Sequence, residues 1–188
     1  MDKGTQKHSW TYEQGYLPGA QFPIYSTINA FNFNGLTLRV ELYDDRNNLK
    51  LKKIECSKVL LNNESEIASP QAIFKVEQYV KSIFQQASIV IDSTATDTLE
   101  IRLEALDARL LGFFYIKAHG LCQIRVKYKE LNKVYCCDIV DGDEHSPLSA
   151  SAFVTRKTAS RYMGSASIRE NIEQFLVDLE KVNNNNVK

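Results

Sequence analysis

The 188-residue sequence predicts an α+β fold, in which a mainly antiparallel sheet carries two amphipathic helices packed on one face. Two observations support this class. Several segments alternate between apolar and polar residues, as strands with one buried face do. Two other segments repeat apolar residues at spacings of three and four, as amphipathic helices do. Because each kind of element has one apolar side, we expect the strands and helices to bury those sides against each other.

Length and composition predict one folded domain. Apolar residues make up 44% of the chain and charged residues 24%, which is ordinary for a globular protein. We expect an extended aromatic arm over residues 1–35, a single α+β domain over residues 36–181, and a disordered polar tail over residues 182–188. Basic and acidic residues both number 23, so the chain lacks the basic excess of many nucleic-acid-binding proteins. No apolar run reaches the roughly 18 residues of a membrane-spanning helix.

The first predicted element of the domain is a strand over residues 36–42, where Leu and Val alternate with polar residues. It ends in a sequence rich in Asp and Asn, which favour turns because their side chains bond to nearby backbone. We expect Asp44 to accept backbone N–H groups or to pair with Arg46, in a structural role rather than a binding one. A second, less regular strand is expected over residues 49–54.

The first helix is predicted over Ser69–Ala87. Ser69 suits the N-cap, and Pro70 suits the first helical position because its missing N–H has no partner there. One apolar stripe runs along the helix: Ala72, Ile73, Val76, Val80, Ile83, Phe84 and Ala87. We expect the helix to stop near Ser88, before a short strand-like run at residues 89–91.

Three further alternating runs predict strands at residues 99–103, 124–128 and 134–140. The first is expected to bend or bulge near Gly112. The other two form a hairpin whose outer side carries three cations: Arg125, Lys127 and Lys129. We interpret this cationic side as a solvated sheet face, with anionic lipid, nucleic acid or a partner protein as alternatives.

The last part of the domain is predicted to be a loop followed by a helix. Residues 141–166 contain Gly and Pro and a basic group made of Arg156, Lys157 and Arg161. The helix is expected to begin at a capping box over Ser167–Glu170, in which the serine and glutamate side chains satisfy exposed backbone donors. Its buried stripe is predicted to contain Ile168, Ile172, Phe175, Leu176 and Leu179.

Four cysteines do not decide the compartment: Cys56, Cys122, Cys136 and Cys137. Adjacent residues of a strand point to opposite faces, so Cys136 and Cys137 are poorly placed to share one metal ion. We favour buried thiols. A disulfide involving Cys56 is the alternative, and it requires an oxidising compartment. A zinc site with His119 or His145 is the least favoured interpretation.

Catalytic motifs are sparse. The chain has no Gly-rich phosphate loop, no His-Glu-x-x-His and no Gly-x-Ser-x-Gly. His8, His119 and His145 lie in segments expected to be arm or loop. One acidic group is a candidate for acid/base or cation chemistry: Asp138, Asp141, Asp143, Glu144 and His145. It lacks the downstream Glu of a calcium loop, so we interpret it as a plain acidic turn and expect neither a cofactor nor a metal ion.

The order of these segments resembles that of the YajG-type bacterial envelope lipoproteins and of the related auxiliary lipoproteins of lipid-transporting ABC systems. The resemblance covers residues 36–181, including the strand, the Asp44-Asp45-Arg46 turn, the first helix, the antiparallel strands and the closing helix. It implies a protein anchored to the outer membrane or cell envelope by an N-terminal lipid-modified cysteine, and facing the periplasm. This sequence lacks that cysteine and a preceding signal segment, and residues 1–35 match nothing in the family.

The resulting functional expectation is a non-catalytic periplasmic binding or assembly module whose partner is an envelope protein or a lipid-linked molecule. Nucleic acid is not expected as a partner. The expected contact surface combines Arg125, Lys127 and Lys129 with Arg156, Lys157 and Arg161. The alternative is a soluble hydrolase-type enzyme, with a cytoplasmic location and a site at the Asp138–His145 loop.

Overall fold

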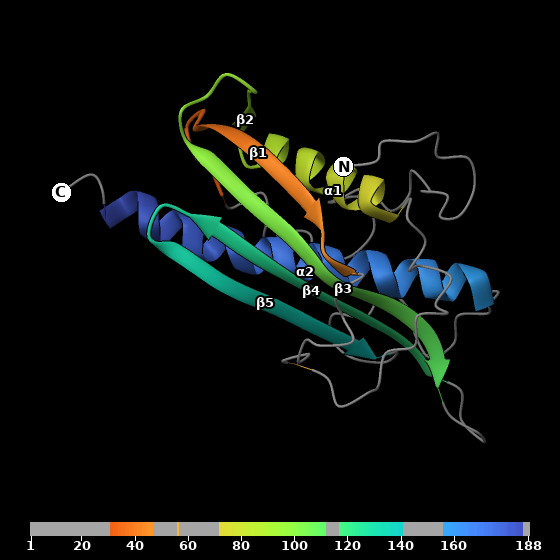
Figure 1. The fold of residues 1–188 in the computed structure, drawn as a ribbon. Helices are drawn as coiled ribbons and strands as arrows, with labels where there is room; N and C mark the ends of the chain where they lie inside the picture. Colours follow the sequence, from red (N-terminus) through yellow and green to blue (C-terminus); the bar gives the residue numbers. More distant parts are fainter. Residues whose placement is uncertain (1–30, 47–55, 57–71, 112–116, 141–155, 186–188) are drawn as a thin grey trace.

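The computed structural model describes residues 31–46, 56, 72–111, 117–140 and 156–185. In this part of the chain, five strands form one sheet in the order β2-β1-β3-β4-β5, and two helices lie together on one of its faces (Figure 1). The elements follow one another as β1 Thr37–Asp44, α1 Ala72–Gln86, β2 Val90–Ile91, β3 Thr98–Leu111, β4 Lys117–Tyr128, β5 Leu131–Val140 and α2 Arg156–Asn185. The predicted α+β class is confirmed.

The sheet is mostly antiparallel, with a parallel part at β1. Strands β3, β4 and β5 form an antiparallel meander, whereas β1 runs parallel to both β2 and β3. Parallel neighbours need a crossover connection that returns the chain to the same end of the sheet. Helix α1 lies in the connection between β1 and β2, so the parallel pairing follows from the order of the elements.

Helix α1 carries the predicted apolar stripe on its buried side. The stripe residues whose side chains are described are all buried: Ile73, Val76, Val80, Ile83, Phe84 and Ala87. After the helix, Ser88 takes a positive φ of 59°, and the Ile89 N–H donates to the Phe84 carbonyl at 2.8 Å, a cap of the Schellman type. The helix therefore ends where the sequence predicts. Ser69 and Pro70 lie outside the described residues.

Strand β3 contains a bulge, at a different place from the one expected. The pairing register with β4 shifts between Leu103 and Ala105, so Glu104 and Ala105 together oppose Gln123. Apolar residues face the helices at every second position up to Leu103, and after the extra residue the inward alternation resumes. The expected bend near Gly112 lies outside the described residues.

Helix α2 begins earlier and ends later than predicted. It starts at Arg156, so Ser167 lies inside the helix and is not its N-cap. The Ser167 hydroxyl donates instead to the Gly164 carbonyl at 2.9 Å, and the predicted capping box is wrong. At its other end the helix continues to Asn185, so residues 182–185 are helical rather than part of a disordered tail.

Helix α2 packs closely on β4 at Met163. Gly120 of β4 lies against the backbone of Met163, and a Cβ at position 120 would come within 2.2 Å of the Met163 carbonyl oxygen. Farther along, the rings of Phe84 and Phe175 contact each other at a centroid distance of 6.2 Å and join α2 to α1.

The remaining predictions concern the ends and loops of the chain. Residues 31–35, which the sequence assigns to the arm, contact the end of α1: Phe33 N–H donates to Ala87 and Gly35 N–H donates to Ser88. Residues 1–30, the strand predicted at 49–54 and the acidic residues 141–145 lie outside the described part. No helix in the described part is long and apolar enough to cross a membrane.

Candidate functional site

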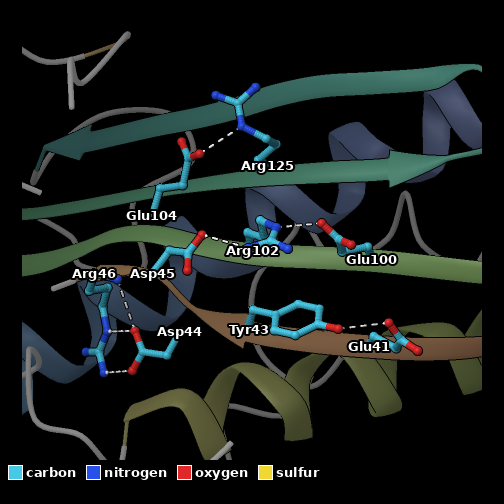
Figure 2. A network of polar contacts seen from close by, with 9 residues as sticks. All are labelled: Glu41, Tyr43, Asp44, Asp45, Arg46, Glu100, Arg102, Glu104 and Arg125. Carbon is cyan, nitrogen blue, oxygen red and sulfur yellow. Dashed lines mark hydrogen bonds and ion pairs between the residues drawn. The ribbon is translucent and has the colours of Figure 1, made fainter. Parts of the chain in front are cut away.

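The outer face of the sheet, opposite the helices, carries a network of charged side chains. Figure 2 shows these residues on neighbouring elements: Glu41 and Tyr43 on β1, Asp45 after its end, Glu100, Arg102 and Glu104 on β3, and Arg125 on β4; it also shows the separate Asp44–Arg46 pair, which does not belong to this set. Alternation explains most of this arrangement, because the apolar residues of the same strands point to the helices and the polar residues point away. We define this set as the outer-face network.

The turn after β1 is held by the pair that the sequence singles out. Arg46 donates to both oxygens of the Asp44 carboxylate, from Nε at 2.8 Å and from a terminal nitrogen at 2.6 Å. The Arg46 backbone N–H also donates to Asp44 at 3.2 Å. The Arg46 side chain is buried, so this two-point contact supplies a partner for its charge. The geometry fits the expected structural role.

Arg102 is the centre of the β1–β3 half of the outer-face network. Its guanidinium donates to Glu100 and, at 3.2 Å, to Asp45, and these two carboxylates raise the pKa of Arg102. It also lies 4.6 Å from the centroid of the Tyr43 ring, within range of a cation–π contact. Tyr43 donates its hydroxyl to Glu41 at 2.9 Å, which raises the pKa of Tyr43. Arg102 and Tyr43 are therefore fixed in place while remaining partly exposed.

Arg125 of the predicted cationic stripe is neutralised by a carboxylate that the sequence does not identify. Glu104 is only 2% exposed, and it accepts Arg125 Nε at 2.8 Å and Gln123 Nε2 at 2.9 Å. Lys129 lies in the hairpin turn and pairs with Asp97 at 3.1 Å. Two of the three predicted cations, Arg125 and Lys129, are therefore paired with carboxylates, and the third, Lys127, is exposed on β4.

The two halves of the predicted contact surface do not lie together. Arg125 points to the outer face of the sheet, whereas Arg156, Lys157 and Arg161 belong to the first turns of α2 on the opposite face. Near the turn of the hairpin, the α2 residue that contacts β5 is Asp178, which accepts from Lys133 at 2.6 Å. Seventeen residues separate Arg161 from Asp178, about 25 Å along a helix. The structure therefore does not bring the two halves of the predicted surface together, and a contact role for either half stays a prediction.

An acid–base pair lies in β4 and β5. His119 is 4% exposed, and its Nε2 contacts a carboxylate oxygen of Asp138. The sequence predicts a strand at Asp138 but an arm or loop at His119; both belong to strands, and the Cα register brings Leu121 opposite Asp138 and His119 opposite Val140. Within the described ranges, His119 Nδ1 has no hydrogen-bond partner. Only the register could have revealed this pair, and no motif in the sequence encodes it.

The cysteines divide into one disulfide and two buried thiols. Cys56 and Cys136 are joined, with a Cα–Cα distance of 5.5 Å across a sequence separation of 80. Burial raises the pKa of Cys122 to about 12 and also raises the pKa of Cys137, so neither thiol is reactive at neutral pH. In the described ranges no three His, Cys, Asp or Glu side chains are grouped to hold a metal ion. The disulfide alternative for Cys56 is the one that the structure contains.

Comparisons with known proteins identify structural neighbours of the chain but do not assign it to a family. No protein-family model matches the chain, and no curated protein is similar to it. Protein XCC0632 from Xanthomonas campestris, described with the family model DUF330, is 10% identical, with coverage of 82% of this chain and 91% of that one and a TM-score of 0.47. A minor lipoprotein from Acinetobacter baumannii is 10% identical, with coverage of 78% and 94% and a TM-score of 0.43. At these values the neighbours assign neither a family nor a function.

Proposed function

We propose that this protein is a non-catalytic binding or assembly module of the bacterial cell envelope, working in an oxidising compartment outside the cytoplasm. The observation that carries the proposal is the disulfide between Cys56 and Cys136. Disulfides persist in the periplasm and other oxidising compartments and are rare in the cytosol. The sequence resemblance to envelope lipoproteins supports the same compartment and adds a lipid anchor to the proposal.

The outer-face network is the proposed contact surface. Tyr43 and Arg102 belong to the residue types that most often dominate protein interfaces. Tyr43 is 39% exposed, and the ring lies against a guanidinium that two carboxylates already hold. Side chains fixed before binding lose less conformational entropy when a partner docks. The proposed partner is an envelope protein or a lipid-linked molecule that contacts this face.

Site-specific crosslinking in cells tests the surface. A photo-reactive amino acid replaces Tyr43 in one variant and Lys81 in the control, because Lys81 is exposed on α1 at the other side of the sheet. We expect crosslinked partner bands from position 43 and none of the same mass from position 81. Arg102→Ala in the position-43 background should weaken those bands. Equal crosslinking from both positions would contradict the proposed surface.

A hydrolase-type enzyme remains a second candidate because of one observation, the contact between His119 and Asp138. A carboxylate that orients a histidine is part of many catalytic triads. In the described ranges, however, no hydroxyl or thiol donates to the free Nδ1 of His119. Hydrolysis of ester or phosphate substrates that is lost in Asp138→Asn would favour this candidate over the binding module.

A further inference from the structure

The two cysteines of the disulfide differ in how far solvent reaches them. Cys136 lies opposite Gln123 in the β4–β5 register, so its side chain leaves β5 through the outer face of the sheet. Cys136 is half-buried there, whereas Cys56 is exposed. A thiolate opens a disulfide by attacking one of its two sulfur atoms, and access to that sulfur is one of the factors that set the rate. Access therefore favours attack at Cys56.

The contact between the two cysteines favours Cys136 as the sulfur that leaves. The Cys56 backbone N–H donates to Cys136 Sγ at 3.3 Å. When the disulfide is attacked at Cys56, negative charge develops on Cys136 Sγ, and a hydrogen bond to a charged acceptor is stronger than one to a neutral acceptor. The carboxylate of Asp138, two residues farther along the same face, already contacts His119. The same backbone donor thus stabilises the leaving sulfur.

The two remaining cysteines do not take part in this exchange. Cys137 follows Cys136 directly, but adjacent residues of a strand point to opposite faces. Cys137 lies on the helix side, where Cys122 is its cross-strand neighbour, and both are buried. Burial raises the pKa of both thiols, so little of either is present as the attacking thiolate at neutral pH. The attacking thiol therefore comes from another molecule.

We propose that Cys56 is a thiol-exchange site, at which an external thiol opens the disulfide of the folded protein. The external thiolate bonds to Cys56 Sγ, the bond to Cys136 Sγ breaks, and its electron pair leaves on Cys136 as a thiolate that takes a proton from water. A second external thiol then displaces the first from Cys56, so two thiols are oxidised to one disulfide while the protein disulfide is reduced. This inference is independent of the proposed binding surface.

Mapping the mixed disulfide on the folded wild-type chain tests the proposal. The protein is incubated with reduced glutathione, quenched with acid, alkylated and digested for mass spectrometry. We expect glutathione on Cys56 and an alkyl group on Cys136, formed at a rate proportional to the glutathione concentration. An adduct on Cys136 would overturn the proposal. A rate that reaches a plateau at the unfolding rate would overturn it too, because the disulfide would then react only in the unfolded chain.

Two single variants compare the sulfur atoms directly. Cys136→Ser leaves the Cys56 thiol free, and Cys56→Ser is its matched control, which leaves the Cys136 thiol free. With a small disulfide reagent, the Cys56 thiol should react about tenfold faster or more than the Cys136 thiol while both variants are folded. The two rates should become equal in urea. Equal rates in the folded variants would contradict the assigned site, and the wild-type mapping decides the matter if a variant does not fold.

A protein thiol is the second probe, because the external thiol can belong to a small molecule or to a protein. The probe is a thioredoxin-like protein whose second active-site cysteine is replaced by serine, so that the mixed disulfide stays trapped. We expect the trapped bond on Cys56. A faster reaction than with glutathione, at equal thiolate concentration, assigns the exchange to protein dithiols, and a slower one assigns it to small thiols. A bond trapped on Cys136 would overturn the proposal.

Discussion

Single residues determine how the sheet contacts the helix packed on it and how its first long strand ends. Gly120 allows the α2 backbone to contact β4 directly, and the Asp44–Arg46 pair holds the end of β1. The sequence indicates the second of these, because an Asp two residues before an Arg at a strand end can form a local turn. The sequence does not indicate the close approach at Gly120, because contact between Gly120 and Met163 depends on two elements far apart in the chain. The same reason hides the contact of His119 with Asp138.

Gly120→Ala should destabilise the fold by about 1–3 kcal/mol, the usual cost of forcing an extra methyl group into a packed interior. The added Cβ would lie 2.2 Å from a backbone oxygen that cannot rotate away. Thermal denaturation followed by circular dichroism measures the loss.

The control for Gly120→Ala is Gly35→Asn. A Cβ at Gly35 meets nothing within 4 Å, and Asn tolerates the positive φ of 78° found there better than most residues. We expect this variant to melt close to the wild-type temperature. A Gly120→Ala variant that is as stable as wild type would show that α2 does not pack on β4 at this distance.

At the scale of elements, the periodicity of apolar residues predicts helices and strands that have one apolar side. It fails for a helix or strand that is buried on all sides. Helix α1 is predicted almost to its last residue, because its stripe is regular. The start of α2 is misplaced because buried Ser165, Ser167 and Arg169 interrupt an apolar stripe and resemble a helix cap. The bulge in β3 leaves a trace in the sequence, since Leu103 and Leu106 are three residues apart instead of two. The parallel direction of β1 follows from the helical crossover rather than from its own residues.

Asp178 joins α2 to β5, and the ionisation of its carboxyl group should make the stability of this contact depend on pH. Burial favours its neutral form, but hydrogen bonds from Lys133, Lys181 and Tyr135 outweigh burial and lower the pKa of Asp178 to about 2. A carboxyl group whose pKa is lower in the folded protein than in the unfolded chain stabilises the fold at pH values above 3.8, the unfolded pKa of Asp178. This stabilisation is lost as the pH falls from 3.8 toward 2. Both lysines are more than half exposed, so solvent screening limits the effect to about 1 kcal/mol.

Urea unfolding of wild type and Asp178→Asn at several pH values measures this contribution. We expect the difference in unfolding free energy between the two proteins to be largest above pH 4 and to shrink toward pH 2. Glu180→Gln is the control, because Glu180 is exposed on the same helix and takes part in none of these bonds. A difference that stays constant between pH 2 and pH 6 would contradict the assigned contact.

For the whole molecule, one covalent link connects the fold to the proposed compartment. The disulfide attaches Cys56 to the outer face of β5 across a sequence separation of 80 residues. Closing a loop of that length restricts the unfolded chain and contributes about 4.5 kcal/mol in the chain-entropy model. The sequence could name Cys56 as a candidate, but it could not choose its partner among three other cysteines, because the choice depends on which face each cysteine occupies. Cys137 points to the helices, and Cys136 points away from them.

The thiol state of the protein taken from its own cells tests the central claim most directly. The protein is denatured without reductant, alkylated, digested and analysed by mass spectrometry, with a reduced sample as the control that yields four alkylated cysteines. The account predicts a linked peptide pair containing Cys56 and Cys136, together with alkylated Cys122 and Cys137. Four alkylated cysteines in the sample that was never reduced would contradict a working place in an oxidising compartment.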